Sequence, residues 1–175
     1  MQRVPFPDLE KLQPHVRQSV ERFKLNIVSM SANGSPQVFD GFAKMGGAVA
    51  GDCAFSALVR EAVILRVGHL SRSEYELLHH RSIARSLGMD EKTLKAIETQ
   101  DYAALEPDMA SAAKFADEVV VKGNCSDATL ADVSKHYGAR GVIDLIFLIG
   151  LYMAVARVIA VSGIPLDGDA LKSLG

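Results

Sequence analysis

Apolar residues recur at helical spacing on both sides of a short polar break at Ser71 and Arg72. Spacings of three and four residues place side chains on one face of an α-helix. We therefore predict two helices, 55–70 and 73–87, joined by a tight turn. The apolar positions are Leu58, Val59, Val63, Ile64, Leu65 and Val67 before the break, and Tyr75, Leu78, Ile83 and Leu87 after it.

The rest of the chain repeats this periodicity between residues that begin and end helices. Ser35 followed by Pro36 is a typical helix start, and Gly88 and Gly123 are typical residues just beyond a helix end. No turn dipeptide is flanked by alternating apolar residues, so no strand is predicted. The further helices are expected at 16–30, from 36 to 47 or as far as 51, at 90–97 and 107–123, from 126 to 136 or 137, and at 140–162.

These patterns predict an all-α, single-domain helical bundle. Residues 1–24 are polar and broken by prolines, and we expect an N-terminal arm or short helix there. Residues 25–175 are expected to form the helical domain. The apolar fraction of 49% is ample for one small core, which favours burial of further apolar surface in a homo-oligomer.

Four side chains near the predicted turn have the chemistry for moving protons. Ser73, Glu76 and His80 are spaced to share one face of the second helix. Glu61 precedes them by enough residues to lie on the first helix. If the helices are antiparallel, two carboxylates, a hydroxyl and an imidazole converge between them, as general acid–base catalysis requires.

This spacing resembles the carboxymuconolactone decarboxylase and alkylhydroperoxidase D (AhpD-like) superfamily. Its redox branch carries Glu, then Cys-x-x-Cys, then His, and Glu61, Ser73, Glu76 and His80 occupy those positions here. Both cysteines are absent, so the chain is similar to the cysteine-free, decarboxylase-like branch. The segments GNCSDATL and LIGLYMAVARVIAVSGIPLD also resemble it, and the resemblance covers residues 25–167.

The resemblance implies an AhpD-like bundle that assembles into dimers, trimers or hexamers. It implies a decarboxylase-like or isomerase-like acid–base enzyme, without cofactor or metal, acting on a small carboxylated lactone or related ring acid. Thiol peroxidase activity is disfavoured, because neither motif position supplies a thiolate. A non-enzymatic oligomer that binds a small ligand or a partner protein is the alternative. The assigned residues are Glu61, Glu76 and His80 as catalytic, and Ser73, His69 and Tyr75 as substrate-binding.

The catalytic candidates also have purely structural interpretations. Glu61 would pair with Arg60 or with Arg66 in its own or a neighbouring helix. Glu76 stands four residues before a histidine, a spacing common in surface pairs. Ser73 stands three residues before Glu76, which is the spacing of a capping box, so its hydroxyl would cap the second helix.

The remaining histidines and tyrosines leave further alternatives open. His69 either lines the pocket or ends a helix, where the dipole favours it. His79 is offset by about 100° from His80 around the helix and is expected to be structural or exposed. Tyr75 and Tyr152 are more typical of a core. Two histidines and two glutamates would suffice for a metal ion, but no HExxH signature is present.

Charge and cysteine content exclude several other classes. A net charge of −2 without a clustered basic face gives no basis for nucleic-acid binding. Cys53 and Cys125 are too far apart for a metal or redox motif, and we expect free thiols. The N-terminus has no apolar signal segment, so a cytoplasmic protein is expected.

The last predicted helix resembles a membrane span in composition. A span needs about 20 apolar residues, whereas Asp144 and Arg157 interrupt this helix and confine its uncharged part to 145–156. A charge inside a bilayer is costly. We therefore expect a core or interface helix, no membrane, and a small-molecule substrate as the partner.

Overall fold

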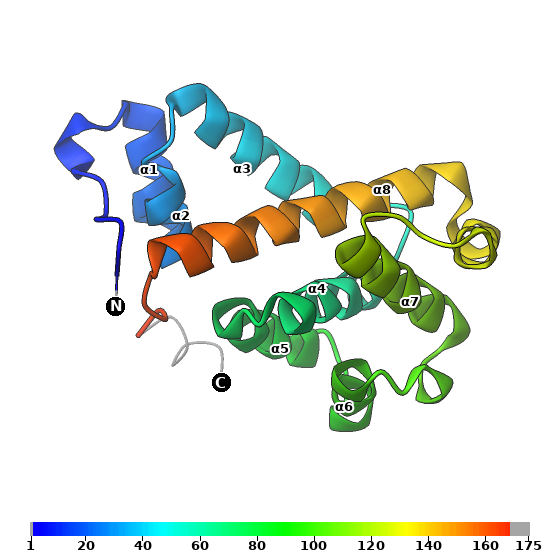
Figure 1. Cartoon of the computed structure of the whole chain (residues 1–175). Helices are drawn as coiled ribbons and strands as arrows, with labels where there is room; N and C mark the ends of the chain where they lie inside the picture. The colour runs from blue at the N-terminus through cyan, green and yellow to red at the C-terminus, as the bar shows by residue number, and fades with distance from the viewer. Residues whose placement is uncertain (1, 169–175) are drawn as a thin grey trace.

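The computed structural model describes residues 2–168, and its regular elements are all helices (Figure 1). No strand occurs in that range, so the predicted all-α fold is confirmed. The α-helices are α1 (Pro14–Phe23), α2 (Asn26–Ser31), α3 (Pro36–Ala50), α4 (Ala57–Ser71), α5 (Glu74–Ser86), α6 (Glu91–Thr99), α7 (Pro107–Lys122) and α8 (Asp127–Ser162). Two short 3-10 turns, η1 (Leu9–Lys11) and η2 (Tyr102–Ala104), precede α1 and α7.

Most helices begin and end at the residues that the sequence indicated. The Ser35 hydroxyl accepts a hydrogen bond from Val38 N, and Asp90 caps α6 through Thr93 N at 2.7 Å. Gly123 and Gly163 adopt left-handed backbone just beyond α7 and α8. Side-chain caps and glycine stops therefore fix these boundaries.

Two predicted boundaries needed correction. The single helix expected at 16–30 is two helices, because Lys24 takes left-handed backbone (φ 52°) and ends α1. The helix expected to end at 47 or to run as far as 51 takes the longer extent and ends at Ala50, so this boundary needed no correction. The segments expected at 126–137 and 140–162 form α8, with a kink at Gly138, whose φ is 63° and ψ −176°.

Helix α4 lies at the centre of the bundle, in contact with α5, α6, α7 and α8 (Figure 1). A helix that is apolar on all sides is typical of such a position. Two charged residues are nevertheless buried there, Glu61 and Arg66, each 2% exposed. Arg66 is neutralised by Asp117 at 2.8 Å and donates to Ile97 O, so it ties α4 to α7 and to the last turns of α6.

A tight turn reverses the chain between α4 and α5. Ser73 N donates to Gly68 O and Arg72 N donates to His69 O, which is the Schellman pattern, with Arg72 left-handed at φ 53°. The helices also approach closely here, since a Cβ built on Gly68 would lie 3.0 Å from Leu77 Cδ2. A glycine at position 68 therefore permits the packing that sets α5 against α4.

The N-terminal helices form a smaller core beside the main one. Val16 and Val20 of α1 pack with Ala32 and Phe39. The residues expected to form an arm thus include a helix that shares buried contacts with α3, across the boundary predicted after residue 24.

Helix α8 leaves part of its apolar surface uncovered. It contacts α2, α3, α4 and α7, and by length and composition it is the one candidate membrane span in the described chain. Ile143, Phe147 and Val161 recur at helical spacing and are 51%, 56% and 60% exposed. Arg157 lies on the same helix and donates to Ser71 Oγ at 2.9 Å.

Replacing Arg72 by glycine should stabilise the fold. Left-handed backbone costs a non-glycine residue about 1–2 kcal/mol, and the greater freedom of glycine in the unfolded chain offsets part of this. We expect the free energy of unfolding in urea to rise by about 1 kcal/mol. Lys44→Gly, at an exposed interior position of α3, should lower it by about 0.5–1 kcal/mol. A loss of stability in Arg72→Gly would contradict the turn geometry.

Candidate active site

A cavity of about 450 Å³ lies between α1, α2, α3, α5 and α8. Its walls are mainly aliphatic and aromatic. One face of α5 supplies most of the polar lining, through Tyr75, Glu76, His79 and His80, and Tyr152 of α8 joins them. An apolar cavity with a few convergent polar groups is the usual form of a small-molecule site.

Glu61 and His80 are joined by a short hydrogen bond between α4 and α5. His80 Nδ1 lies 2.7 Å from Glu61 Oε2, and the other carboxylate oxygen accepts from Arg60 Nε at 3.1 Å. Because a carboxylate only accepts, it holds the proton of His80 on Nδ1. Nε2 then carries the free lone pair and has no hydrogen-bond partner among residues 2–168. Glu61 itself does not line the cavity.

Glu76 is a buried carboxyl group without a partner. It is 3% exposed, and neither oxygen has a hydrogen-bond partner in the described chain. Burial raises the pKa of Glu76 to about 7, and the Ser73 hydroxyl and the Arg157 charge offset this only in part. No full hydrogen bond joins Ser73 to the carboxyl group. Near neutral pH a substantial fraction of the group therefore keeps a proton that it can donate.

His79 and Tyr75 belong to a second buried network that reaches the end of the described chain. Asp167, 4% exposed, accepts from His79 Nε2 at 2.9 Å, from Asn26 N at 2.7 Å and from the Tyr75 hydroxyl. Tyr75 also accepts from Ile27 N. The network fastens residue 167 and the start of α2 to α5, and so holds one wall of the cavity in place.

Sequence reasoning missed two residues at the site. His79 was expected to point elsewhere, yet both His79 and His80 line the cavity, because its wall spans more than 100° of the α5 surface. Tyr152 comes from the distant helix α8, and its ring meets that of His80 edge-on at 5.0 Å. Burial raises the pKa of Tyr152, and Glu61 and Glu76 raise it further. Tyr152 was not predicted at the site because its neighbours in the sequence are apolar, which is typical of a core position.

Two of the predicted substrate-binding residues lie elsewhere. Ser73 is buried at the N-cap of α5, but its hydroxyl neither caps the helix nor lines the cavity. His69 ends α4 among charged groups outside the cavity, and burial together with Arg81 and Arg66 lowers its pKa. The third, Tyr75, does line the cavity, with its hydroxyl held by Asp167.

The two cysteines lie outside the site as unpaired thiols. Burial raises the pKa of Cys53, aided by Asp144, and burial with Glu118 raises that of Cys125. Both sites therefore disfavour the thiolate that peroxide reduction requires. Across residues 2–168, no three His, Cys, Asp or Glu side chains are grouped to hold a metal ion.

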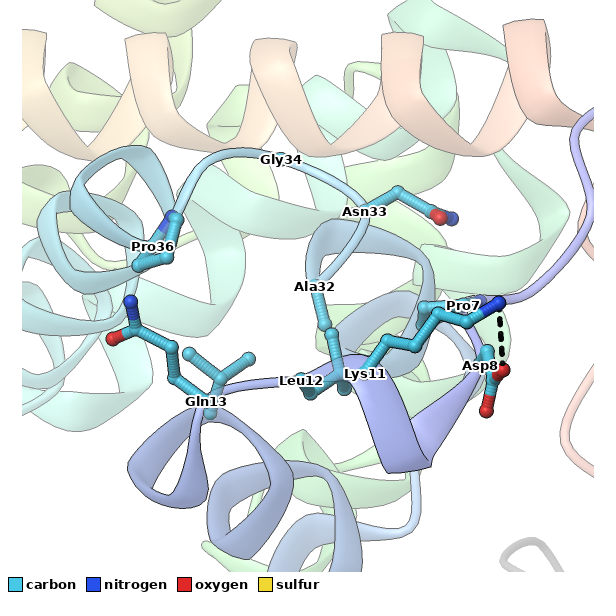
Figure 2. Close-up of a pocket in the computed structure, with 10 residues that line it drawn as sticks. Pro7, Asp8, Lys11, Leu12, Gln13, Ala32, Asn33, Gly34 and Pro36 are labelled. Carbon is cyan, nitrogen blue, oxygen red and sulfur yellow. Dashed lines mark ion pairs between the residues drawn. The ribbon is translucent and has the colours of Figure 1, made fainter.

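A second cavity, of about 380 Å³, lies between the N-terminal segment and the α2–α3 turn (Figure 2). Figure 2 shows Asp8 and Lys11 paired across its edge, at 3.2 Å. Its lining includes Leu12, Asn33 and Pro36, with no buried titratable side chain. It therefore lacks the acid–base chemistry found around Glu76.

The raised pKa of Glu76 predicts a pH-dependent stability. Below the ordinary value of 4.5 both folded and unfolded states hold the proton. As pH rises toward about 7 only the unfolded state ionises, so stability is lost across this window. Relative to Glu76→Gln, the wild-type free energy of unfolding should fall by about 3 kcal/mol between those limits, measured by urea denaturation.

The matched control is Glu74→Gln, at an exposed glutamate in the same first turn of α5. The free energy of unfolding of this variant should stay within about 0.5 kcal/mol of the wild-type value across the same pH range. If the difference in free energy of unfolding between wild type and Glu76→Gln were also independent of pH, Glu76 would be shown to be ionised in the folded protein.

Comparison with known proteins shows a family match over part of the chain and a shared fold. Residues 36–118 match the carboxymuconolactone decarboxylase family, and no curated protein matches the sequence. The AhpD core of a peroxidase-related protein from Ralstonia eutropha JMP134 superposes with a TM-score of 0.83 at 17% identity, covering 97% of this chain and 94% of that one.

Two further crystal structures share the fold. A peroxidase-related protein from Silicibacter sp. TM1040 has a TM-score of 0.77 at 18% identity, over 99% of this chain and 92% of that one. The debrominase Bmp8, in complex with 2,3,4-tribromopyrrole, has a TM-score of 0.74 at 14% identity, over 99% and 94%. The chain is thus similar to the carboxymuconolactone decarboxylase family over residues 36–118, and it shares the AhpD-like fold with these crystal structures.

Proposed function

We propose that the protein is a cofactor-free acid–base enzyme that moves a proton at a carbon beside the carbonyl of a small ring compound. The observation that carries this proposal is the unpartnered Glu76 carboxyl group in the same cavity as His80, which Glu61 orients. A buried acid without a partner destabilises a fold, so its presence in a cavity supports a catalytic role.

His80 is the base in this proposal. Its Nε2 lone pair takes a proton from carbon, and the imidazolium that forms is stabilised by Glu61 at Nδ1. Glu61 acts through His80 and is therefore a positioning residue. Arg60 holds the other oxygen of Glu61 and so fixes the orientation of the carboxylate.

Glu76 is the acid. With its pKa near 7, the group donates a hydrogen bond or a proton to the substrate carbonyl oxygen, where negative charge develops. Tyr152 lies against His80 and lines the same cavity. Its raised pKa keeps that hydroxyl protonated and able to donate.

The same groups serve both reactions expected for the superfamily. In an isomerisation, His80 removes a proton, the electron pair of the C–H bond passes into the enolate, and the imidazolium returns the proton at another carbon. In a decarboxylation, the C–C bond to the carboxylate breaks, its electron pair forms the enolate, CO₂ leaves, and a proton is added to carbon. The name of the matching family supports the second reaction.

The debrominase with the same fold binds a small ring compound, 2,3,4-tribromopyrrole. This supports a ring-sized ligand for the present cavity. Thiol peroxidase activity receives no support from Cys53 and Cys125, which are not among the residues that line the cavity and have raised pKa values.

Replacing His80 by alanine should lower the rate by about 10²–10⁴-fold. The assay is incorporation of deuterium from heavy water into a panel of cyclic ketones and lactones, with and without a ring carboxyl group, followed by NMR. Glu61→Gln should lower the rate by a smaller factor and change its pH profile, because the imidazolium loses its carboxylate.

His69→Ala is the matched control, since His69 lies outside the cavity. It should leave exchange unchanged. Exchange that proceeds equally in wild type and His80→Ala, or that no compound of the panel undergoes, would refute the acid–base function and favour a ligand-binding module.

We also propose that the exposed apolar face of α8 is covered by a second copy of the chain. Ile143, Ile146 and Phe147 are exposed on adjacent positions of that face, and exposed apolar patches mark interaction surfaces. Arg157 and Asp144 on the same helix disfavour lipid as the covering medium.

Light scattering at micromolar concentration should give a multiple of the 18.8 kDa chain mass. Phe147→Glu should shift the protein toward the monomer without loss of helix content, because a charge would be buried in the contact. Val121→Glu changes an apolar residue on α7 that is 69% exposed and should leave the mass unaltered. A single-chain mass for the wild type would contradict the assembly.

A further inference from the structure

The cavity is apolar except at one end. Large apolar side chains form its walls, among them Phe23, Phe39, Phe42, Ile83, Leu151 and Val155. The polar groups, apart from Ser19 on α1, are the α5 residues at positions 75, 76, 79 and 80 together with Tyr152. A ligand that fills this space has a hydrophobic body and a single polar end.

Among residues 2–168, no lysine or arginine lines the cavity. Arg60 is engaged by Glu61 and by Ala50 O at 2.8 Å, and Arg157 is an exposed residue bound to Ser71. Neither guanidinium lines the cavity. An anionic ligand would therefore lose its hydration without gaining a cationic partner.

Acidic groups dominate the polar end. Glu76 faces the cavity, Glu61 stands behind His80, and Asp167 stands behind His79. Each histidine is thus already hydrogen-bonded to a carboxylate. A carboxylate on the ligand would be repelled by Glu61 and Asp167, the two carboxylates that stand behind the histidines.

Two glycines on α3 keep the cavity open. Gly46 and Gly47 both line it, and a Cβ built on either would have no atom within 4 Å. Glycine weakens a helix by about 0.5–1 kcal/mol relative to alanine, so the two positions cost stability. Their benefit is the space that larger side chains would occupy.

We infer that the cavity binds an uncharged, mainly hydrophobic ring compound whose single carbonyl oxygen faces Glu76 and His80, and that Gly46 and Gly47 determine how large that compound is. The inference rests on the acid–base function proposed above and names its substrate class. It favours the isomerase-like reaction, because a decarboxylation requires a carboxylate on the substrate. The lactone acids expected from the family resemblance are thereby replaced by neutral ring carbonyl compounds.

The test compares two probes that share one ring system. α-Tetralone is neutral, whereas the matching tetralin carboxylate carries a carboxylate where α-tetralone carries its carbonyl. Calorimetry at about pH 6, where Glu76 holds its proton, should show binding of α-tetralone and at least about tenfold weaker binding of the carboxylate. Equal or tighter binding of the carboxylate would overturn the inference, as would no binding of α-tetralone.

Paired variants of α3 locate the bound probe. Gly46→Leu should weaken α-tetralone binding at least about tenfold by filling the cavity. Gly41→Leu makes the same change on the same helix, at an exposed position that lies off the cavity and is also free of nearby atoms. It should bind like the wild type, and both variants should keep full helix content. Undiminished binding by Gly46→Leu would overturn the assignment of this cavity.

The outcomes separate this inference from the proposed function. Deuterium exchange confined to carboxylated compounds and dependent on His80 would refute the neutral substrate class and leave acid–base catalysis standing. Selective binding of α-tetralone by the wild type, with exchange indifferent to His80→Ala, would uphold the ligand class and refute the catalysis.

Discussion

The close pairing of α4 with α5 is the constraint on which the site depends. The Schellman turn at Arg72 reverses the chain. Because Gly68 has no side chain, Leu77 of α5 can pack closely against α4 at that position. This pairing brings Glu61 within 2.7 Å of His80, although 19 residues separate them. It also buries Glu76 on the α5 face that lines the cavity. A change in the approach of the helices would separate the base from the group that orients it.

Three buried acids in this region are accommodated in different ways. Glu61 forms an ion pair with Arg60 and a hydrogen bond with His80. Asp167 accepts hydrogen bonds from three groups on α2 and α5. Glu76 has neither kind of partner, so burial favours its protonated form instead. The fold thus keeps an oriented imidazole and a neutral carboxylic acid in one cavity. These are the complementary groups that proton transfer to or from an enolate requires.

The fold class and most helix boundaries could be predicted because their signals are local. Capping side chains such as Ser35 and Asp90 act within one turn of helix, and they act in the structure as the sequence indicated. The break at Lys24 was missed because a lysine seldom takes left-handed backbone, and nothing local marks it. The kink at Gly138 lies between two segments that the sequence had separated.

The sequence by itself determined the all-α class, the α4–α5 pair, and the placement of Glu76 and His80 on one helix face, because helical spacing is a property of neighbouring residues. The tertiary structure decided which acid is neutral, which histidine contacts Glu61, and that Tyr152 and Asp167 join the region. It also placed Ser73 and His69 outside the cavity lining. These outcomes depend on burial and on contacts between distant segments, such as Asp167 with α5. No spacing within one helix encodes them, since desolvation and long-range hydrogen bonds arise only once the helices have packed.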